Sequence, residues 1–90
     1  MTAASNEVVF ITGATAGMGA AFARRFIAEG ARVIATGRRA DRLELLREEL
    51  GDRLHVSVLD VCDRKAVDQC ITTLPPDFTE ISVLINNAGL

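Results

Sequence analysis

The sequence has 90 residues, of which 49% are hydrophobic and 24% charged, and this composition indicates one globular domain at most. Ten lysines and arginines against twelve acidic residues leave a net charge of −2, which excludes a large basic field for nucleic acid or an acidic membrane surface. Because the apolar runs are only a few residues long, we expect no membrane-spanning helix, and residues 1–7 lack the basic and apolar regions of a signal peptide.

The cysteine, histidine and tyrosine content limits which disulfide, metal-binding and catalytic roles these residues can have. Cys62 and Cys70 are too few for a disulfide scaffold, so we expect a reduced, cytoplasmic protein. His55 has no cysteine or carboxylate at metal-ligand spacing, so we expect no metal. The chain contains no tyrosine and no tryptophan, and Lys65 is its only lysine. A mechanism that needs a catalytic tyrosine therefore cannot be completed by these residues.

Four short runs rich in apolar and β-branched residues predict strands, over residues 8–11, 32–36, 54–59 and 81–85. The first, second and fourth runs are apolar without strict alternation, which predicts burial on both faces of a sheet. Glycine ends the first two runs at Gly13 and Gly37, and a turn of Asn, Ala and Gly follows the fourth at 86–89.

Three segments with helical periodicity lie between the strands. Their expected apolar faces are Met18, Phe22 and Phe26; Leu43, Leu46 and Leu50, in a helix over 40–50; and Val67, Cys70, Ile71 and Leu74. Gly30 stands at the C-cap of the first helix, Asp63 at the N-cap of the third, and Pro75 and Pro76 end the third. The order β-α-β-α-β-α-β predicts an α/β fold with parallel strands, right-handed crossovers and helices on both faces.

The turn after the first strand carries the first candidate site. Its glycines are spaced G-x-x-x-G-x-G, and its residues are Gly13, Ala14, Thr15, Ala16, Gly17, Met18 and Gly19. One glycine permits the tight turn, a second lets the backbone approach a pyrophosphate, and a third lets the helix pack on the strand. The N-terminus of the helix offers N–H groups to phosphates. The alternative is an ordinary strand-to-helix loop that contains glycines.

The end of the second strand carries the second candidate site. In dinucleotide folds, an acidic residue here accepts a bond from the ribose 2′-OH, whereas an arginine binds a 2′-phosphate. This chain has Gly37 without a carboxylate, followed by Arg38 and Arg39, whose planar guanidinium groups suit a phosphate. The alternative is a solvated pair of charges at the start of a helix.

Two further strand ends carry polar side chains. After the third strand, Asp60 could accept a bond from an adenine amino group while Val61 covers the ring; Asp60 could equally cap local backbone N–H groups. After the fourth strand, two carboxamides and two small residues, at 86–89, could bond neighbouring backbone and let a flat ligand approach; the alternative there is a plain turn.

These motifs, in this order, resemble the amino-terminal half of the short-chain dehydrogenase/reductase family. The resemblance covers residues 8–90 and rests on Thr12, Gly13, Gly17 and Gly19, then Asp60, then Asn86, Asn87, Ala88 and Gly89. The stretches 11–19, 33–39 and 84–90 are most similar to the NADP-dependent 3-hydroxy acid dehydrogenase group, which oxidises serine, allo-threonine and related acids. The resemblance implies a Rossmann-like parallel sheet with strand order 3-2-1-4, residues 1–90 being the amino-terminal part of one NAD(P)-binding domain.

The resemblance also implies a role for each motif, with NADP as the cofactor. Gly13 to Gly19 would line the pyrophosphate, with Thr15 near the adenine ribose. Arg38 and Arg39 would hold the 2′-phosphate, and Asp60 and Val61 would flank the adenine. Asn87, Ala88 and Gly89 would contact the ribose side, while Asn86 and Thr12 chiefly tie strands together. The substrate would be a small hydroxy or oxo compound, and the full-length protein a homo-oligomer.

The chain departs from the family in one respect. The family's catalytic Asn, Ser and Tyr-x-x-x-Lys segment has no counterpart in these 90 residues, so we expect no catalytic residue here and a fragment or truncated product. The parent would be an NADP-dependent oxidoreductase that interconverts a hydroxyl and a carbonyl group. The alternative is a catalytically inactive dinucleotide-binding fragment.

Overall fold

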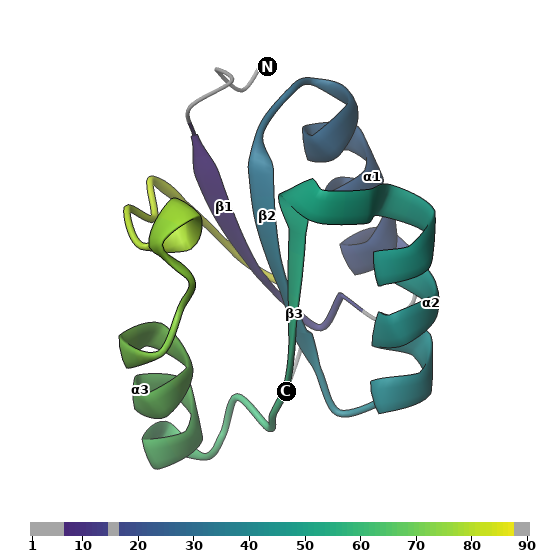
Figure 1. The fold of residues 1–90 in the computed structure, drawn as a ribbon. Coiled ribbons are helices and arrows are strands. Elements are labelled where there is room, and N and C mark those ends of the chain that lie inside the picture. The colour runs from purple at the N-terminus through teal and green to yellow at the C-terminus, as the bar shows by residue number, and fades with distance from the viewer. Residues whose placement is uncertain (1–6, 15–16, 88–90) are drawn as a thin grey trace.

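A parallel four-stranded sheet forms the centre of the molecule. The computed structural model describes residues 7–14 and 17–87, and its strands are β1 (Val8–Thr12), β2 (Arg32–Gly37), β3 (Leu54–Val58) and β4 (Val83–Asn86). They pair in the order β3-β2-β1-β4, and every pair is parallel (Figure 1). The predicted strand order and the α/β class are therefore confirmed.

Helices cover both faces of this sheet. On one face lie α1 (Gly17–Ala28) and α2 (Ala40–Leu50), and on the other lie α3 (Arg64–Thr72) and the short 3₁₀ helix η2 (Pro76–Phe78), as Figure 1 shows. A second 3₁₀ turn, η1 (Gly51–Arg53), joins α2 to β3. The two apolar cores are separated by the sheet, since Val9 and Ile11 pack under α1 whereas Val8 and Phe10 pack under α3.

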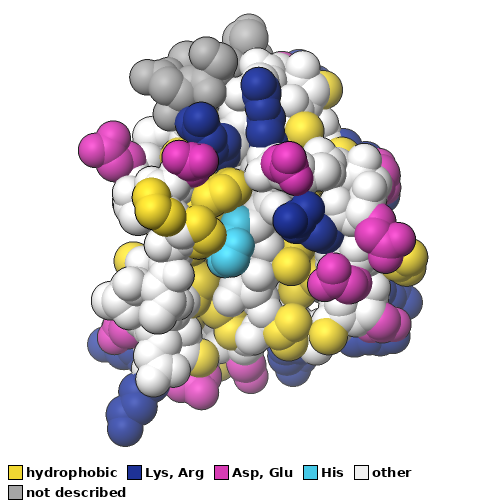
Figure 2. All heavy atoms as spheres, viewed as in Figure 1, with side chains coloured by type: hydrophobic (Ala, Val, Ile, Leu, Met, Phe, Trp, Pro, Cys, Tyr) yellow, Lys and Arg dark blue, Asp and Glu magenta, His cyan; other side chains and the backbone are white. Residues whose placement is uncertain are grey.

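The surface mixes both signs of charge. On the face seen in Figure 2, lysine and arginine side chains are interspersed with aspartate and glutamate side chains. Among the described helices, none has the length and apolar character that crossing a bilayer demands.

The strands differ in how deeply they are buried. All of β1 is buried, and β2 is buried from Val33 onward, as predicted. The prediction of burial on both faces is wrong for β4, where Leu84 is 66% exposed. Leu84 is in register with the buried Phe10 of β1, but α3 and η2 pack over β1 and β2 and do not extend over β4.

Strand boundaries differ by one or two residues from their predicted positions. β4 starts at Val83 rather than 81, although the Ser82 N–H donates to the Val8 carbonyl at 2.9 Å and the Ser82 hydroxyl accepts from the Val8 N–H at 3.2 Å. β3 ends at Val58, although the Leu59 N–H still donates to the Gly37 carbonyl at 2.8 Å. β1 includes Thr12.

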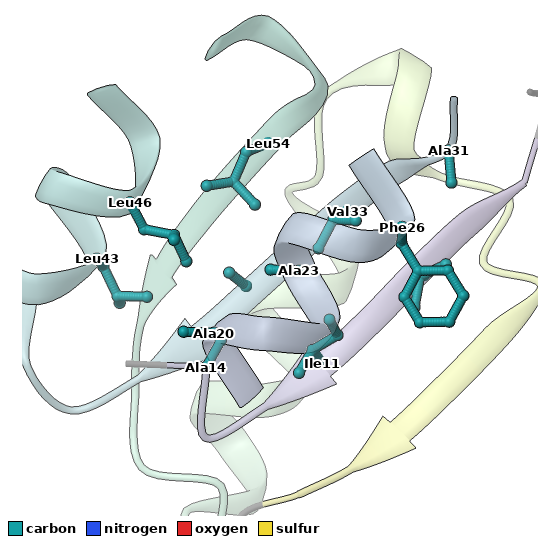
Figure 3. Packing of buried hydrophobic residues seen from close by; sticks show 12 residues of the cluster. Ile11, Ala14, Ala20, Ala23, Phe26, Ala31, Val33, Leu43, Leu46 and Leu54 are labelled. Atoms are coloured by element: carbon teal, nitrogen blue, oxygen red, sulfur yellow. The ribbon is translucent and has the colours of Figure 1, made fainter. Parts of the chain in front are cut away.

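Two helix faces also differ from prediction. The buried face of α1 consists of Gly19, Ala20, Ala23 and Phe26. Met18 is 64% exposed, so the predicted stripe through Met18 is wrong at its first position. Small side chains bring α1 close to the sheet, where Ala20 and Ala23 lie over Ile11 and Val33 (Figure 3).

On α3, Cys70 is buried, as is Leu74 just beyond the helix, whereas Ile71 is 45% exposed. The prediction of Ile71 as a core residue is therefore wrong, because α3 turns Ala66, Val67 and Cys70, and not Ile71, toward the apolar cluster on the sheet. The predicted N-cap is present, since the Asp63 carboxylate accepts from the Ala66 N–H at 3.2 Å.

Candidate functional site

The predicted site residues gather at one edge of the sheet. Gly13 follows β1, Arg38 follows β2, Asp60 lies just beyond β3, and Asn87 follows β4. Because all four strands are parallel, their carboxyl ends meet at the same edge, which is where open α/β sheets bind ligands.

The glycine turn is shaped by its backbone. Gly13 and Gly17 have φ values of 67° and 59°, a region that glycine adopts without strain. Ala14 is fully buried, and its N–H donates to the Thr36 carbonyl at 2.9 Å, which ties the turn to β2. Thr15 and Ala16 of the predicted site lie outside the described residues.

Gly19 is where α1 approaches the turn most closely. A Cβ on Gly19 would overlap the Gly13 carbonyl oxygen and lie 2.8 Å from Asn87 Nδ2 and 2.9 Å from Ala14 Cα. No side chain fits in this space, so the first turn of α1 rests directly on the backbone that leaves β1. The predicted role for this glycine, close helix packing, is what its surroundings require.

A hydrogen-bond network joins the ends of β1 and β4. The Thr12 hydroxyl donates to Asn86 Oδ1 at 3.1 Å and accepts from the Asn87 N–H at 3.0 Å. The side-chain amide of Asn87 donates to the Gly13 carbonyl at 3.1 Å. Asn86 and Thr12 thus tie the two strands together, as the family resemblance implies. Ala88 and Gly89 lie outside the described residues.

Asn87 bonds neighbouring backbone, as predicted for the carboxamides at this strand end, although its partner was not predicted. Its Nδ2 braces the glycine turn, so the side chain is fixed in place before any ligand arrives. The sequence offered one signal for this bond, namely a carboxamide at the end of the strand that neighbours β1. The pairing with Gly13, however, joins residues 74 positions apart and is not encoded in local periodicity.

The end of β2 presents two exposed arginines. Gly37 itself is buried, and Arg38 and Arg39 both extend into solvent. Arg39 is the N-cap of α2, and its side chain makes no capping bond. Its Nε lies 3.7 Å from Asp41 Oδ1, in an ion pair whose side chains are 58% and 71% exposed. Within the described part of the chain, Arg38 forms no ion pair.

Asp60 uses one carboxylate oxygen locally. Its Oδ1 accepts from the Cys62 N–H at 2.9 Å, and its carbonyl accepts from the Asp63 N–H at 2.9 Å. The local cap that the sequence analysis left open is therefore present. The exposed side chain still carries a second oxygen, Oδ2, and Val61 beside it packs partly against the apolar cluster under α3.

A hollow of about 170 Å³ separates α1 from α2 beside the glycine turn. Its lining consists of Ala14, Ala20, Arg24, Arg42, Leu45, Leu46 and Glu49. Arg24 bridges the two helices with a pair of bonds to Glu49, at 2.8 and 3.2 Å. This hydrogen bonding lowers the pKa of Glu49 and raises the pKa of Arg24. Sequence periodicity does not predict this pair, which joins residues 25 positions apart.

The part of the chain that the structure describes holds no metal centre beside these groups. Across residues 7–14 and 17–87, no three His, Cys, Asp or Glu side chains come together as a metal would require. The chemistry available at this edge is therefore that of backbone N–H groups, two guanidinium groups, a carboxylate and carboxamides.

The family assignment rests on the comparison with known proteins. The family model described as short chain dehydrogenase matches residues 7–90. The chain belongs to the short-chain dehydrogenase family. The strand order of the sheet agrees with that assignment, and so does the resemblance inferred from the sequence motifs.

Individual relatives are similar over nearly the whole chain. The NADP-dependent 3-hydroxy acid dehydrogenase of Escherichia coli K12 is 51% identical over 83 residues, which are 92% of this chain and 34% of that protein. Serine 3-dehydrogenase of Agrobacterium fabrum is 51% identical over 82 residues, 91% of this chain and 33% of that protein. The chain therefore spans about a third of the length of the curated relatives it matches.

A solved relative carries the cofactor. The closed form of serine dehydrogenase complexed with NADP⁺ superposes with a TM-score of 0.90 at 51% identity, covering 92% of this chain and 34% of that one. This likeness confirms the Rossmann-like fold predicted from the sequence.

Proposed function

We propose that residues 1–90 bind the adenosine half of NADP(H), as the amino-terminal part of one NAD(P)-binding domain. The protein to which they contribute is an oxidoreductase that interconverts a hydroxyl and a carbonyl group. The proposal is supported by membership of the short-chain dehydrogenase family and by relatives, about half identical, that are NADP-dependent.

The residues at the end of β2 favour NADP(H) over NAD(H). Gly37 offers no carboxylate to a ribose 2′-OH, and Arg38 and Arg39 follow it in solvent at the N-terminus of α2. Guanidinium groups bind phosphate through paired, charge-assisted hydrogen bonds, and a helix N-terminus favours an anion. A 2′-phosphate fits this set of donors, whereas a free 2′-OH leaves the Arg38 cation without an anionic partner among the described residues.

The other strand ends complete the proposed site. The turn from Gly13 to Gly19 receives the pyrophosphate, since Gly19 leaves the backbone bare where a side chain would intrude. Asp60 Oδ2 accepts from the adenine amino group beside Val61. Asn87, braced on Gly13, contacts the ribose side.

These residues bind and orient, and they do not transfer the proton. NADP supplies hydride transfer when it is bound. The 90 residues contain no tyrosine, so the proton step of the proposed reaction needs a group outside them. We propose small 3-hydroxy acids such as serine or allo-threonine as substrates, because both curated relatives are named for that class. A homo-oligomeric full-length protein in a reducing, cytoplasmic setting, where Cys62 and Cys70 remain thiols, completes the proposal.

A second candidate function is dinucleotide binding without catalysis. The absence of tyrosine favours it, since these residues alone hold a cofactor site and no catalytic phenol. The two functions share the adenosine site and differ only in turnover.

Calorimetric titration tests the shared site. We expect the chain to bind adenosine 2′,5′-bisphosphate more tightly than 5′-AMP. Arg38→Ala should weaken the bisphosphate by about ten- to a hundredfold, the loss of one charge-assisted bond, and should leave 5′-AMP nearly unchanged. Arg64→Ala, an exposed arginine at the start of α3, is the matched control. Equal affinity of the chain for the two nucleotides would contradict the proposal.

A further inference from the structure

One of the two arginines at the end of β2 already has an ionic partner. Arg39 Nε lies 3.7 Å from Asp41 Oδ1, whereas Arg38 forms no ion pair within the described residues. We propose that Asp41 is a specificity-determining residue, which competes with the cofactor's 2′-phosphate for Arg39 and so weakens the preference for NADP(H) over NAD(H). This inference rests on the proposed function.

The local backbone holds the competing carboxylate at the site. Arg39 is the N-cap of α2 with φ −102° and ψ 92°, and Asp41 is the second residue of the helix. A carboxylate in the first turn of a helix is favoured by the exposed N–H groups there. The helix terminus therefore favours a carboxylate at Asp41, close to the Arg39 guanidinium, independent of any ligand.

A phosphate bound to Arg39 would lie near the Asp41 carboxylate, and the two anions would repel each other. Charge-assisted bonds bring phosphate oxygens to within about 3 Å of the guanidinium, so the phosphate and Asp41 come within roughly 8 Å of each other. That separation is comparable with the Debye length at physiological salt, so the repulsion is only partly screened. Binding must either break the ion pair or place two anions around one cation.

The effect is small because the pair is exposed. More than half of each side chain is accessible to solvent, and exposed ion pairs are weak. Removing the charge of Asp41 should therefore tighten the binding of a 2′-phosphate by about two- to fivefold, with a smaller gain at high salt. Arg38, without such a competitor, should contribute more to phosphate binding than Arg39.

The experiment compares two nucleotides on matched variants. Asp41→Asn keeps the side-chain shape and removes the charge, Asp41→Glu keeps the charge, and Asp52→Asn removes a similar exposed charge on η1, at the opposite end of α2. We expect Asp41→Asn to bind adenosine 2′,5′-bisphosphate about two- to fivefold more tightly, with 5′-AMP unchanged. Asp41→Glu and Asp52→Asn should match the unmodified chain. A structural effect of the substitution would move both nucleotides together and would contradict the inference, as would a weakened affinity for the bisphosphate.

A double-mutant cycle tests whether Asp41 acts through Arg39. The gain from Asp41→Asn should shrink in the Arg39→Ala background, because no guanidinium remains there to be released. A gain of unchanged size would overturn the competition for Arg39. The proposed function fails separately, since in that case the unmodified chain itself would not prefer the bisphosphate over 5′-AMP.

Discussion

The side-chain amide of Asn87 donates a hydrogen bond to the carbonyl oxygen of Gly13 at 3.1 Å, across 74 residues of sequence. This bond passes directly in front of Gly19, where the lack of a side chain leaves room for both partners. The end of β4, the turn after β1 and the first turn of α1 are thus packed as one unit. The geometry of the proposed pyrophosphate site depends on all three.

Gly19→Ala should disrupt that unit. The new methyl group would overlap the Gly13 carbonyl oxygen and press on Asn87 Nδ2 and Ala14 Cα, and two of these three atoms belong to the backbone. Overpacking of this kind should lower the free energy of unfolding by about 1–3 kcal/mol, as measured by urea denaturation. It should also weaken nucleotide binding by about tenfold, the equivalent of about 1.4 kcal/mol.

Gly51→Ala provides the control for this substitution. Gly51 has a positive φ of 81°, but nothing lies within 4 Å of the position that its methyl group would take. It stands between α2 and β3, away from the site. The substitution should lower stability through backbone strain and leave nucleotide affinity unchanged. Wild-type affinity in Gly19→Ala would show that the turn does not need this close approach.

We expect no dehydrogenase turnover from residues 1–90 alone. The chain has no tyrosine to carry the proton, so serine or 3-hydroxypropionate should yield no NADPH by absorbance at the reduced nicotinamide band. A full-length relative, serine 3-dehydrogenase of Agrobacterium fabrum, serves as the positive control. NADPH formation above background by the purified chain would refute this prediction and would point to an unassigned proton donor.

The exposed edge of β4 should make the 90-residue chain self-associate. Among the described strands, β4 pairs with β1 alone, Leu84 is exposed, and no charged residue lies between Ile81 and Asn87. Uncharged edges recruit further strands. Light scattering should therefore give a mass above that of the monomer, and Leu84→Lys should lower it.

Leu45→Lys is the matched control for the edge. Leu45 and Leu84 are equally exposed, but Leu45 lies on α2 rather than on a strand. Leu45→Lys should leave the mass measured by light scattering unchanged. A monodisperse wild-type monomer with a sharp, cooperative melt would show that the four-stranded sheet is self-sufficient.

His55 should make stability depend on pH. Its ring packs against Phe78 with centroids 5.6 Å apart, and Figure 2 shows the chain's only histidine among apolar side chains. Burial, with a smaller contribution from the charge of Arg47, lowers the pKa of His55 below its usual value of 6.5. The unfolded chain then binds the proton more readily, so the free energy of unfolding should decrease as the pH falls below 6.5 toward the folded value.

His55→Phe isolates this contribution. The variant keeps a ring against Phe78 but cannot be protonated, so urea denaturation should show a flatter pH dependence in the same window. Parallel pH profiles for the two proteins would rule out His55 as the source.

Local periodicity predicts most of this fold, because each strand and helix carries its own signal. The strand order follows from the family resemblance. The predictions of buried residues fail where burial depends on which other elements pack against the segment. Ala20 and Ala23 give a weak apolar signal but form the contact face of α1, and Leu84 has a strong apolar signal but lies where no helix covers it.

The candidate site, like the fold, could be predicted only in part from the sequence. The positions of Gly13, Arg38, Asp60 and Asn87 could be predicted, because the ends of parallel strands must meet at one edge. The bond from Asn87 to Gly13 and the ion pair between Arg39 and Asp41 could not, since side-chain geometry decides them.

The ratio of the dissociation constants for NAD⁺ and NADP⁺ on the 90-residue chain tests directly whether the end of β2 selects a 2′-phosphate. Because Gly37 offers no carboxylate and Arg38 extends into solvent where a phosphate can reach it, NADP⁺ should bind about tenfold or more tightly than NAD⁺. The double variant Gly37→Asp with Arg38→Ala should reverse that order. Equal affinities in the unmodified chain, or an order that survives the double substitution, would contradict the assignment of the 2′-phosphate to the end of β2.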